Sequence, residues 1–271
     1  MAEAAAVGAP GDKPKGRRLR VFMETRRKDN WWAPQLLTFV VFSSFIVYAT
    51  WAAFQGEHYT SGPYLSPFYA PELWGTSHHA WFGPPPSWIP SWVPFTPALL
   101  ILPFPGGFRF TCYYYRGAYY KAFWADPPSC AVGESRGKSF LGERYFPLVF
   151  QNVHRYFMYA AVVFIFLLSY DVLLATQFDD GFGIGVGTII MFVNVCLLAS
   201  YTFGCHSLRH LIGGGKDALP KGGLGAACYD GSSKLNTKHQ LFAWCSLFSV
   251  ALTDVYIRLC SMGVITDIRI I

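Results

Sequence analysis

Long apolar runs alternate with polar or proline-rich segments along most of the chain. A helix needs about 20 apolar residues to cross the hydrocarbon layer of a bilayer. Four uninterrupted runs meet this requirement: residues 32–54, 147–175, 182–211 and 239–264. A fifth run, residues 92–120, contains Pro103, Pro105, Gly106 and Gly107, which predict a kinked or broken helix. The pattern therefore predicts an all-α integral membrane protein with five transmembrane helices.

The segments between these runs complete the predicted organisation. Residues 31–265 form the membrane domain, and residues 1–30 form a basic tail with eight Lys and Arg. Residues 55–91, rich in Pro and aromatic side chains, would cap the outer surface, whereas residues 121–146 and 212–238 would be cytoplasmic loops. We expect His58, His78 and His79 of the outer cap to be exposed.

The distribution of Lys and Arg predicts the orientation. Residues 56–91 contain neither Lys nor Arg, whereas the tail and both predicted cytoplasmic loops are basic. Because positive loops stay on the cytoplasmic side, the N-terminus is predicted inside and the C-terminus outside. The first residues show no apolar core of a cleavable signal peptide. A composition of 52% hydrophobic and 14% charged residues is typical of a chain solvated by lipid, and we expect no nucleic acid among its partners.

Acidic and basic residues inside the apolar runs are few. Asp254 and Arg258 are four residues apart, which predicts an ion pair within one helix in the outer half of the membrane. Asp171 lies at a comparable depth. Charges in the membrane are costly and often functional, but a pair that neutralises itself is an equally good interpretation, and the role of these residues stays open.

Cysteine and histidine residues gather near the predicted cytoplasmic ends of the helices. Cys196, Cys245 and Cys260 fit small apolar helix positions, and Cys228 falls in a polar loop. The remaining candidates for a metal or redox site are Cys112, Cys130, Cys205, His154, His206, His210 and His239. Thiolate with imidazole suits zinc, copper or an iron–sulfur cluster, whereas facing imidazoles suit a haem b. A histidine at a membrane boundary can also be a simple hydrogen-bonding group.

Tyrosine and arginine side chains surround the same level of the membrane. They can serve as interfacial anchors, or they can form a quinone pocket, since a quinone needs an apolar slot and a few donors for its carbonyl oxygens. The candidate quinone-binding residues are Tyr113, His154, Arg155, Tyr156 and Arg209.

Several long strings resemble one family of membrane-anchor subunits. FRFTCYYYRGAYYKAFWADPPSCAVGE, PLVFQNVHRYF, YTFGCHSLRHLIGG, KLNTKHQLFAW and SLFSVALTDVYIRL are similar to the anchor of actinobacterial succinate dehydrogenase, respiratory complex II. The resemblance covers about residues 30 to 265. It implies a bacterial plasma-membrane subunit that holds a flavoprotein and an iron–sulfur subunit on the cytoplasmic face. Its implied role is to pass electrons to a quinone, of menaquinone or ubiquinone type, without acting on succinate by itself.

The resemblance also implies a Rieske-type [2Fe–2S] cluster in the membrane part, held by two cysteines and two histidines. Of the competing residues we favour Cys112, Cys205, His210 and His239. The chain lacks the paired C-x-H loops of ordinary Rieske domains. A haem b-binding anchor is the alternative function. A purely structural anchor and a transporter are further alternatives, although we see no internal repeat of the kind that transporters carry.

Overall fold

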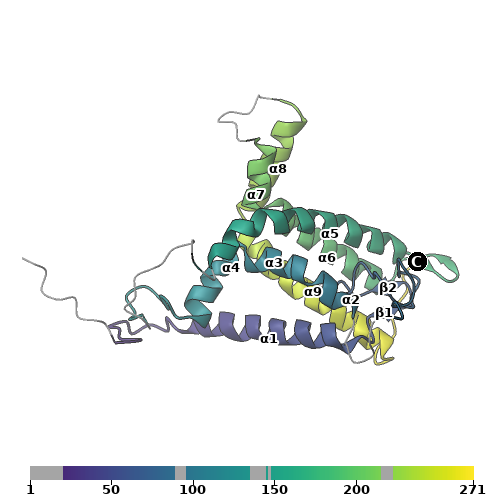
Figure 1. The fold of residues 1–271 in the computed structure, drawn as a ribbon, viewed down its shortest axis with the longest axis horizontal. Coiled ribbons are helices and arrows are strands. Elements are labelled where there is room, and N and C mark those ends of the chain that lie inside the picture. Colours follow the sequence, from purple (N-terminus) through teal and green to yellow (C-terminus); the bar gives the residue numbers. More distant parts are fainter. Residues whose placement is uncertain (1–20, 89–95, 135–144, 146–147, 215–221) are drawn as a thin grey trace, which may run out of the picture.

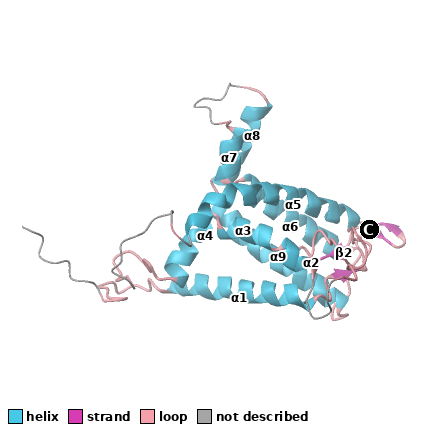
Figure 2. Ribbon diagram, viewed as in Figure 1, coloured by secondary structure: helices cyan, strands magenta, loops and turns pink. Residues whose placement is uncertain are grey.

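Four long apolar helices form the body of the protein. The computed structural model describes residues 21–88, 96–134, 145, 148–214 and 222–271. Within these residues, the helices long and apolar enough to cross a membrane are α1 (Ala33–Gln55), α5 (His154–Leu174), α6 (Val186–Phe203) and α9 (His239–Ser261). The strands in the described part of the chain form two short antiparallel hairpins, β1 (Thr60–Ser61) with β2 (Tyr64–Leu65) and β3 (Gln177–Phe178) with β4 (Gly181–Phe182). This confirms the predicted all-α membrane class (Figure 2).

The fifth predicted span is a chain of short helices. It consists of α2 (Pro97–Ile101), α3 (Pro103–Phe110), α4 (Tyr113–Ala118) and the π-helical turn η1 (Tyr119–Phe123). Prolines begin α2 and α3, because proline has no N–H to donate and is tolerated only in the first turn. Figure 1 shows this chain running from one end of the bundle toward the other, and α3 packs against α5. Its predicted start, residues 92–95, lies outside the described residues.

The fourth predicted span is shorter than expected. The predicted helix over residues 182–211 is wrong at its end, because α6 stops at Phe203 and a separate helix, α7 (His206–Ile212), follows a break at Gly204 and Cys205. The predicted loop 212–238 contains a further helix, α8 (Leu224–Asn236), so Cys228 lies on a helix. Figure 1 shows α7 and α8 standing out from the bundle. At the start of α5, a 3₁₀ turn, η2 (Leu148–Val153), precedes the helix.

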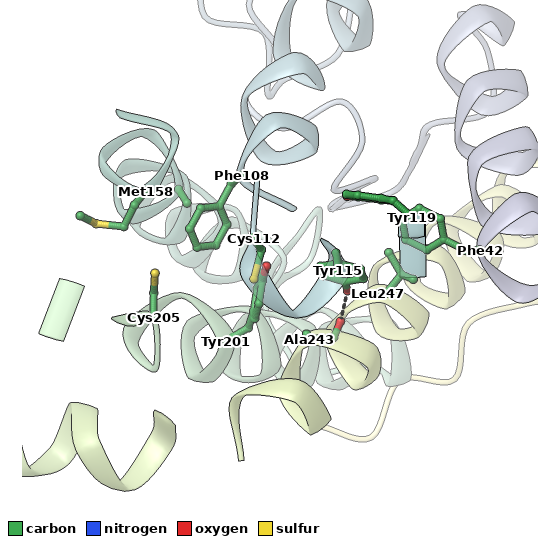
Figure 3. Packing of buried hydrophobic residues seen from close by; sticks show 11 residues of the cluster. Phe42, Phe108, Cys112, Tyr115, Tyr119, Met158, Tyr201, Cys205, Ala243 and Leu247 are labelled. Carbon is green, nitrogen blue, oxygen red and sulfur yellow. Dashed lines mark hydrogen bonds between the residues drawn. The ribbon is translucent and has the colours of Figure 1, made fainter. Parts of the chain in front are cut away.

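The core at the end near α4 and α7 is built largely from aromatic side chains. Its buried members are Phe42, Phe108, Cys112, Tyr115, Tyr119, Met158, Ala161, Tyr201, Cys205, Ala243 and Leu247. Figure 3 shows most of them between α3, α6 and α9. Much of the surface of α1 and α5, in contrast, is exposed and apolar, as expected of helices that face lipid.

The opposite end of the bundle is covered by residues 57–88, which belong to the segment that we predicted to form an outer cap. The ring of Tyr69 stacks on that of Tyr59, with 4.1 Å between centroids. Its hydroxyl donates to the carbonyl oxygen of Ala52, 2.7 Å away. His79 is only 3% exposed, so the expectation that it is exposed is wrong: the cap folds over it and over Asp171 of α5.

The predicted ion pair on α9 is confirmed. Arg258 Nε lies 2.7 Å from the carboxylate of Asp254, and both residues are buried. The carboxylate also accepts hydrogen bonds from Tyr48 of α1 and Ser66 of the cap. The guanidinium donates to the carbonyl oxygen of Glu57 at 2.8 Å. Since buried charges are stable only when paired and hydrogen-bonded, this network joins α1, α9 and the cap.

Candidate metal centre

Two buried cysteines occupy equivalent breaks between helices. Cys112 separates α3 from α4 with φ −69° and ψ 131°, and Cys205 separates α6 from α7 with φ −65° and ψ 135°. Each is 2% exposed and is the N-cap of the helix that follows. The first N–H groups of a helix have no partner within it and carry a partial positive charge. The N–H groups at the start of α4 and α7 favour the thiolate form of these cysteines, whereas burial favours the neutral thiol.

One histidine lies next to each cysteine. His239 begins α9, and its Nε2 is 3.8 Å from Cys112 Sγ. His154 begins α5, and its Nε2 is 3.3 Å from Cys205 Sγ. All four side chains line one cavity of about 280 Å³, which also contacts Thr111, Asn152 and Ser207. We call this cavity the cysteine–histidine pocket. It brings together four separate segments of the chain.

His154 is held in a defined orientation. Its Nδ1 is 2.8 Å from Thr111 Oγ1, and that hydroxyl donates its own proton to the carbonyl oxygen of Gly107 at 2.7 Å. The hydroxyl must therefore accept from Nδ1–H, which leaves Nε2 unprotonated on the side of the pocket. The ring also stacks on Phe108, with 5.0 Å between centroids. A second hydrogen bond of this kind is typical of metal-ligating histidines.

His239 is 2% exposed, and its Nδ1 has no hydrogen-bond partner among the described residues. Its ring stacks on Tyr201 of α6, with 4.8 Å between centroids and 23° between planes. A Cβ atom at Gly204 would lie 3.2 Å from Nδ1, so glycine at the α6 break leaves room for the ring. An unpartnered buried nitrogen is costly unless another group takes up its lone pair or proton.

The structure separates the other candidate ligands from the buried part of this pocket. His206 lies at the rim, is exposed and contacts Arg209, with 2.9 Å between Nδ1 and the guanidinium. His210 is also exposed and lies 3.4 Å from Arg155, because α7 turns away from α6 at Gly204. Cys130 is exposed near the segment of residues 21–29. His154, which we placed in a quinone pocket, lies beside Cys205, where we had expected His210.

The remaining predicted quinone residues lie around the outside of the cysteine–histidine pocket. Tyr113 lines the pocket but is 72% exposed, and Tyr156 is equally exposed. Arg155 is exposed and Arg209 is partly exposed, on α5 and α7. No contact places these residues around a closed apolar slot in the described part of the chain, and their role stays a prediction.

The donor set fits a two-iron cluster better than a single ion. A single tetrahedral metal needs all its ligands at about 2.0–2.3 Å from one point, and in the described residues no group of three Cys, His or acidic side chains is close enough for that. The pocket instead presents two pairs around a common space. Two thiolates and two imidazoles are the ligands of a Rieske-type [2Fe–2S] cluster. A haem held by two imidazoles would leave both buried thiols unused.

The fold is that of a polytopic helical membrane protein, and one pocket of it brings two cysteines and two histidines together at one end of the bundle. The comparisons with known proteins give the family. Residues 33–263 match the actinobacterial succinate dehydrogenase subunit SdhC, and the chain belongs to this family. It is a multi-pass subunit of succinate dehydrogenase in the bacterial plasma membrane, and its partners are the other subunits of that enzyme.

A solved structure supports the assignment. A chain of the Mycobacterium smegmatis Sdh1 complex in the apo form is 42% identical, with a TM-score of 0.84 over 95% of this chain and 98% of that chain. No curated protein matches the sequence.

Proposed function

We propose that this subunit relays electrons from the iron–sulfur subunit of succinate dehydrogenase to a membrane quinone through a Rieske-type [2Fe–2S] cluster. Cys112, Cys205, His154 and His239 would hold the cluster. The observation that carries the proposal is their convergence on one pocket from four separate segments of the chain, with Cys112, Cys205 and His239 buried. When bound, the cluster supplies one-electron transfer, which suits a donor of single electrons and an acceptor that takes two.

The residues around the pocket would orient and stabilise the four ligands. The N–H groups that follow Cys112 and Cys205 would stabilise the two thiolates once a cluster binds them. Thr111 keeps Nε2 of His154 free for a ligand bond, and burial of both cysteines keeps water away from the sulfur atoms. Hydrogen bonding and burial around a cluster set its potential, so these groups would determine how readily the electron arrives and leaves.

The surface next to the pocket suits a cytoplasmic partner. The helices α7 and α8 project beyond the bundle at the end that carries the pocket (Figure 1). This end exposes basic side chains: Lys121, Arg155, Lys234 and Lys238. We propose that the iron–sulfur subunit docks here, with the flavoprotein subunit bound behind it. A docked partner would then place its own redox centre on the side where His154 and His206 approach the surface.

The experiment compares two histidine variants of the purified complex. His154→Ala should abolish the EPR signal of a reduced Rieske-type cluster and stop quinone reduction. The variant should still oxidise succinate when a hydrophilic acceptor takes the electrons before they reach the membrane subunit. His210→Ala, the matched control on the exposed face of α7, should keep both the signal and the activity.

Two results would contradict the proposal. A full-strength cluster signal in the His154→Ala variant would show that the ligand set is wrong. Sharp absorption bands of reduced haem in the unmodified complex, with no acid-labile sulfide, would favour the haem-binding alternative.

A further inference from the structure

Arg109 of α3 places a positive charge inside the bundle among neutral partners. Its guanidinium donates to the hydroxyl of Tyr115 at 2.8 Å, to the carbonyl oxygen of Ala243 at 3.0 Å and to Ser246 Oγ at 2.9 Å. In the part of the chain that the structure describes, no Asp or Glu forms an ion pair with it. A charge held away from water is costly unless another charge compensates it. Arg109 therefore needs a counter-charge that its three acceptors do not supply.

The guanidinium lies next to the cysteine–histidine pocket. It is 4.9 Å from the ring centroid of Tyr201, and the same ring stacks on His239 with 4.8 Å between centroids. This cation–π contact and the ring stack together place the guanidinium within about 10 Å of the imidazole. The hydroxyl of Tyr201 is directed at Cys112, and Figure 3 shows the two side chains together. Ala243, which binds the guanidinium, is one helical turn from His239 on α9.

The environment of Arg109 differs from that of the other basic residues at this end. Its three acceptors belong to residues that are at most 1% exposed. The basic side chains of the proposed docking surface are exposed instead: Lys121, Arg155, Lys234 and Lys238. Water and salt screen the field of exposed charges, whereas buried charges are screened much less. The field of Arg109 consequently reaches the pocket with little attenuation.

The ligand set determines how the charge of the pocket would change on reduction. In an oxidised cluster with two thiolate and two neutral imidazole ligands, the charges of two ferric ions, two sulfides and two thiolates cancel. One electron from the iron–sulfur subunit converts one ferric ion to ferrous, with no bond formed or broken, and leaves one net negative charge. A fixed positive charge nearby stabilises this reduced form relative to the oxidised form.

We propose that Arg109 is the counter-charge of the reduced cluster and raises its reduction potential, so that the membrane subunit accepts electrons more readily. Arg109 does not bind iron in this proposal. It is a positioning residue that acts through space and through Tyr201, which contacts both the guanidinium and His239. The inference rests on the proposed function, because the cluster is its target.

Coulomb's law gives the size of the effect. A unit charge at about 10 Å, in a protein environment with an effective dielectric constant of about 20, changes the equilibrium constant for one-electron reduction about 10-fold. A tenfold change in a one-electron equilibrium corresponds to about 59 mV. Removal of the charge should therefore lower the reduction potential of the cluster by about this amount.

The test is a redox titration of the cluster in the whole purified complex, followed by EPR. Arg109→Gln removes the charge but keeps hydrogen-bond donors, and it should lower the equilibrium constant for reduction about 10-fold. Arg109→Lys is the matched control, since it keeps the charge and should stay within about twofold of the parental constant. The titration involves no quinone turnover, so a change in quinone binding cannot produce the shift.

Ser246 allows the same charge to be neutralised without removing Arg109. Its hydroxyl accepts from the guanidinium, and the residue is fully buried. Ser246→Asp places a carboxylate against the guanidinium and should lower the potential as Arg109→Gln does. Ser246→Ala removes the hydrogen bond alone and should keep the parental potential. This pair tests the charge even if Arg109→Gln does not assemble.

The outcomes separate this inference from the proposed function. A parental potential in assembled Arg109→Gln or Ser246→Asp complexes would overturn the inference and leave Arg109 as a residue that joins α3 to α9. Equal falls in Ser246→Asp and Ser246→Ala would assign the shift to a hydrogen bond and would also overturn it. In both cases the cluster signal itself would still support the proposed function. Absence of that signal from the unmodified complex would refute the proposed function and this inference together.

Discussion

The hydroxyl of Thr111 provides the sharpest test of how the pocket is preorganised. It accepts from His154 Nδ1 at 2.8 Å and donates to Gly107 O at 2.7 Å, and the residue is 3% exposed. Thr111→Val keeps the shape of the side chain while removing both hydrogen bonds. His154 can then rotate, or it can take the tautomer that carries its proton on Nε2. A protonated Nε2 has no lone pair with which to bind a metal.

The size of the effect follows from these two bonds. Loss of a hydrogen bond that orients a metal-ligating histidine typically lowers metal affinity about 10–100-fold. The carbonyl of Gly107 loses a partner as well, and an unpartnered buried polar group costs about 1–3 kcal/mol of stability. We therefore expect Thr111→Val to lower cluster occupancy, measured as acid-labile sulfide per complex and as EPR signal intensity, by at least ~10-fold.

Two controls accompany this variant. Thr111→Ser retains the hydroxyl and should retain the cluster. Thr188→Val removes a buried hydroxyl that donates to the carbonyl of Ala175 at 2.9 Å, at the opposite end of the bundle, and should cost stability without loss of the cluster. Full cluster occupancy in Thr111→Val would refute the assignment of His154 as a ligand oriented by this hydroxyl.

Two further predictions concern both ends of the molecule. Gly204→Ala places a Cβ 2.9 Å from the carbonyl oxygen of Ser200 and 3.2 Å from His239 Nδ1, so we expect it to displace His239 and reduce the EPR signal; a parental signal would contradict this. At the outer cap, burial, with His78 beside it, lowers the pKa of His79 from 6.5 to about 4. As pH falls from about 6.5 toward 4, His79 takes up a proton in the unfolded chain but not in the folded protein, so thermal stability should fall. The fall should be weaker in His79→Gln. Equal slopes of thermal stability against pH in the two proteins would contradict the assignment.

The sequence was sufficient to predict the helical class because membrane spans are long and uniformly apolar. The broken segment of residues 92–120 was also predictable, since Pro103 and Pro105 cannot donate backbone hydrogen bonds. The break at Gly204 and Cys205 was not, because apolar residues continue through α6 into α7 at Leu208, Leu211 and Ile212, and a single glycine is tolerated within helices. His210 therefore lies on a separate helix and is exposed.

His154 and Tyr201 show what a one-dimensional pattern leaves out. His154 precedes an apolar helix, which is equally typical of an interfacial hydrogen-bonding residue, and only the approach of Thr111 and Cys205 distinguishes the two roles. Tyr201 looks like an ordinary core aromatic. The sequence held a signal in both cases. His154 is one of the candidate histidines, and Tyr201 lies four residues before Cys205. Their spatial convergence depends on how α3, α5, α6 and α9 pack.

The helix break at Gly204 and Cys205 links the pocket to the proposed docking surface. If α6 continued through Cys205, that side chain would follow the helical rise, and His206 and His210 would remain on the bundle. The break at Gly204 instead orients Cys205 toward His154 and, in the same step, directs α7 out of the bundle, where Arg209 and Lys234 of α8 become accessible. Cys205, which we propose as a cluster ligand, thus directly precedes the projection that we propose as the docking surface. If both proposals hold, a partner that orders α7 also restrains Cys205.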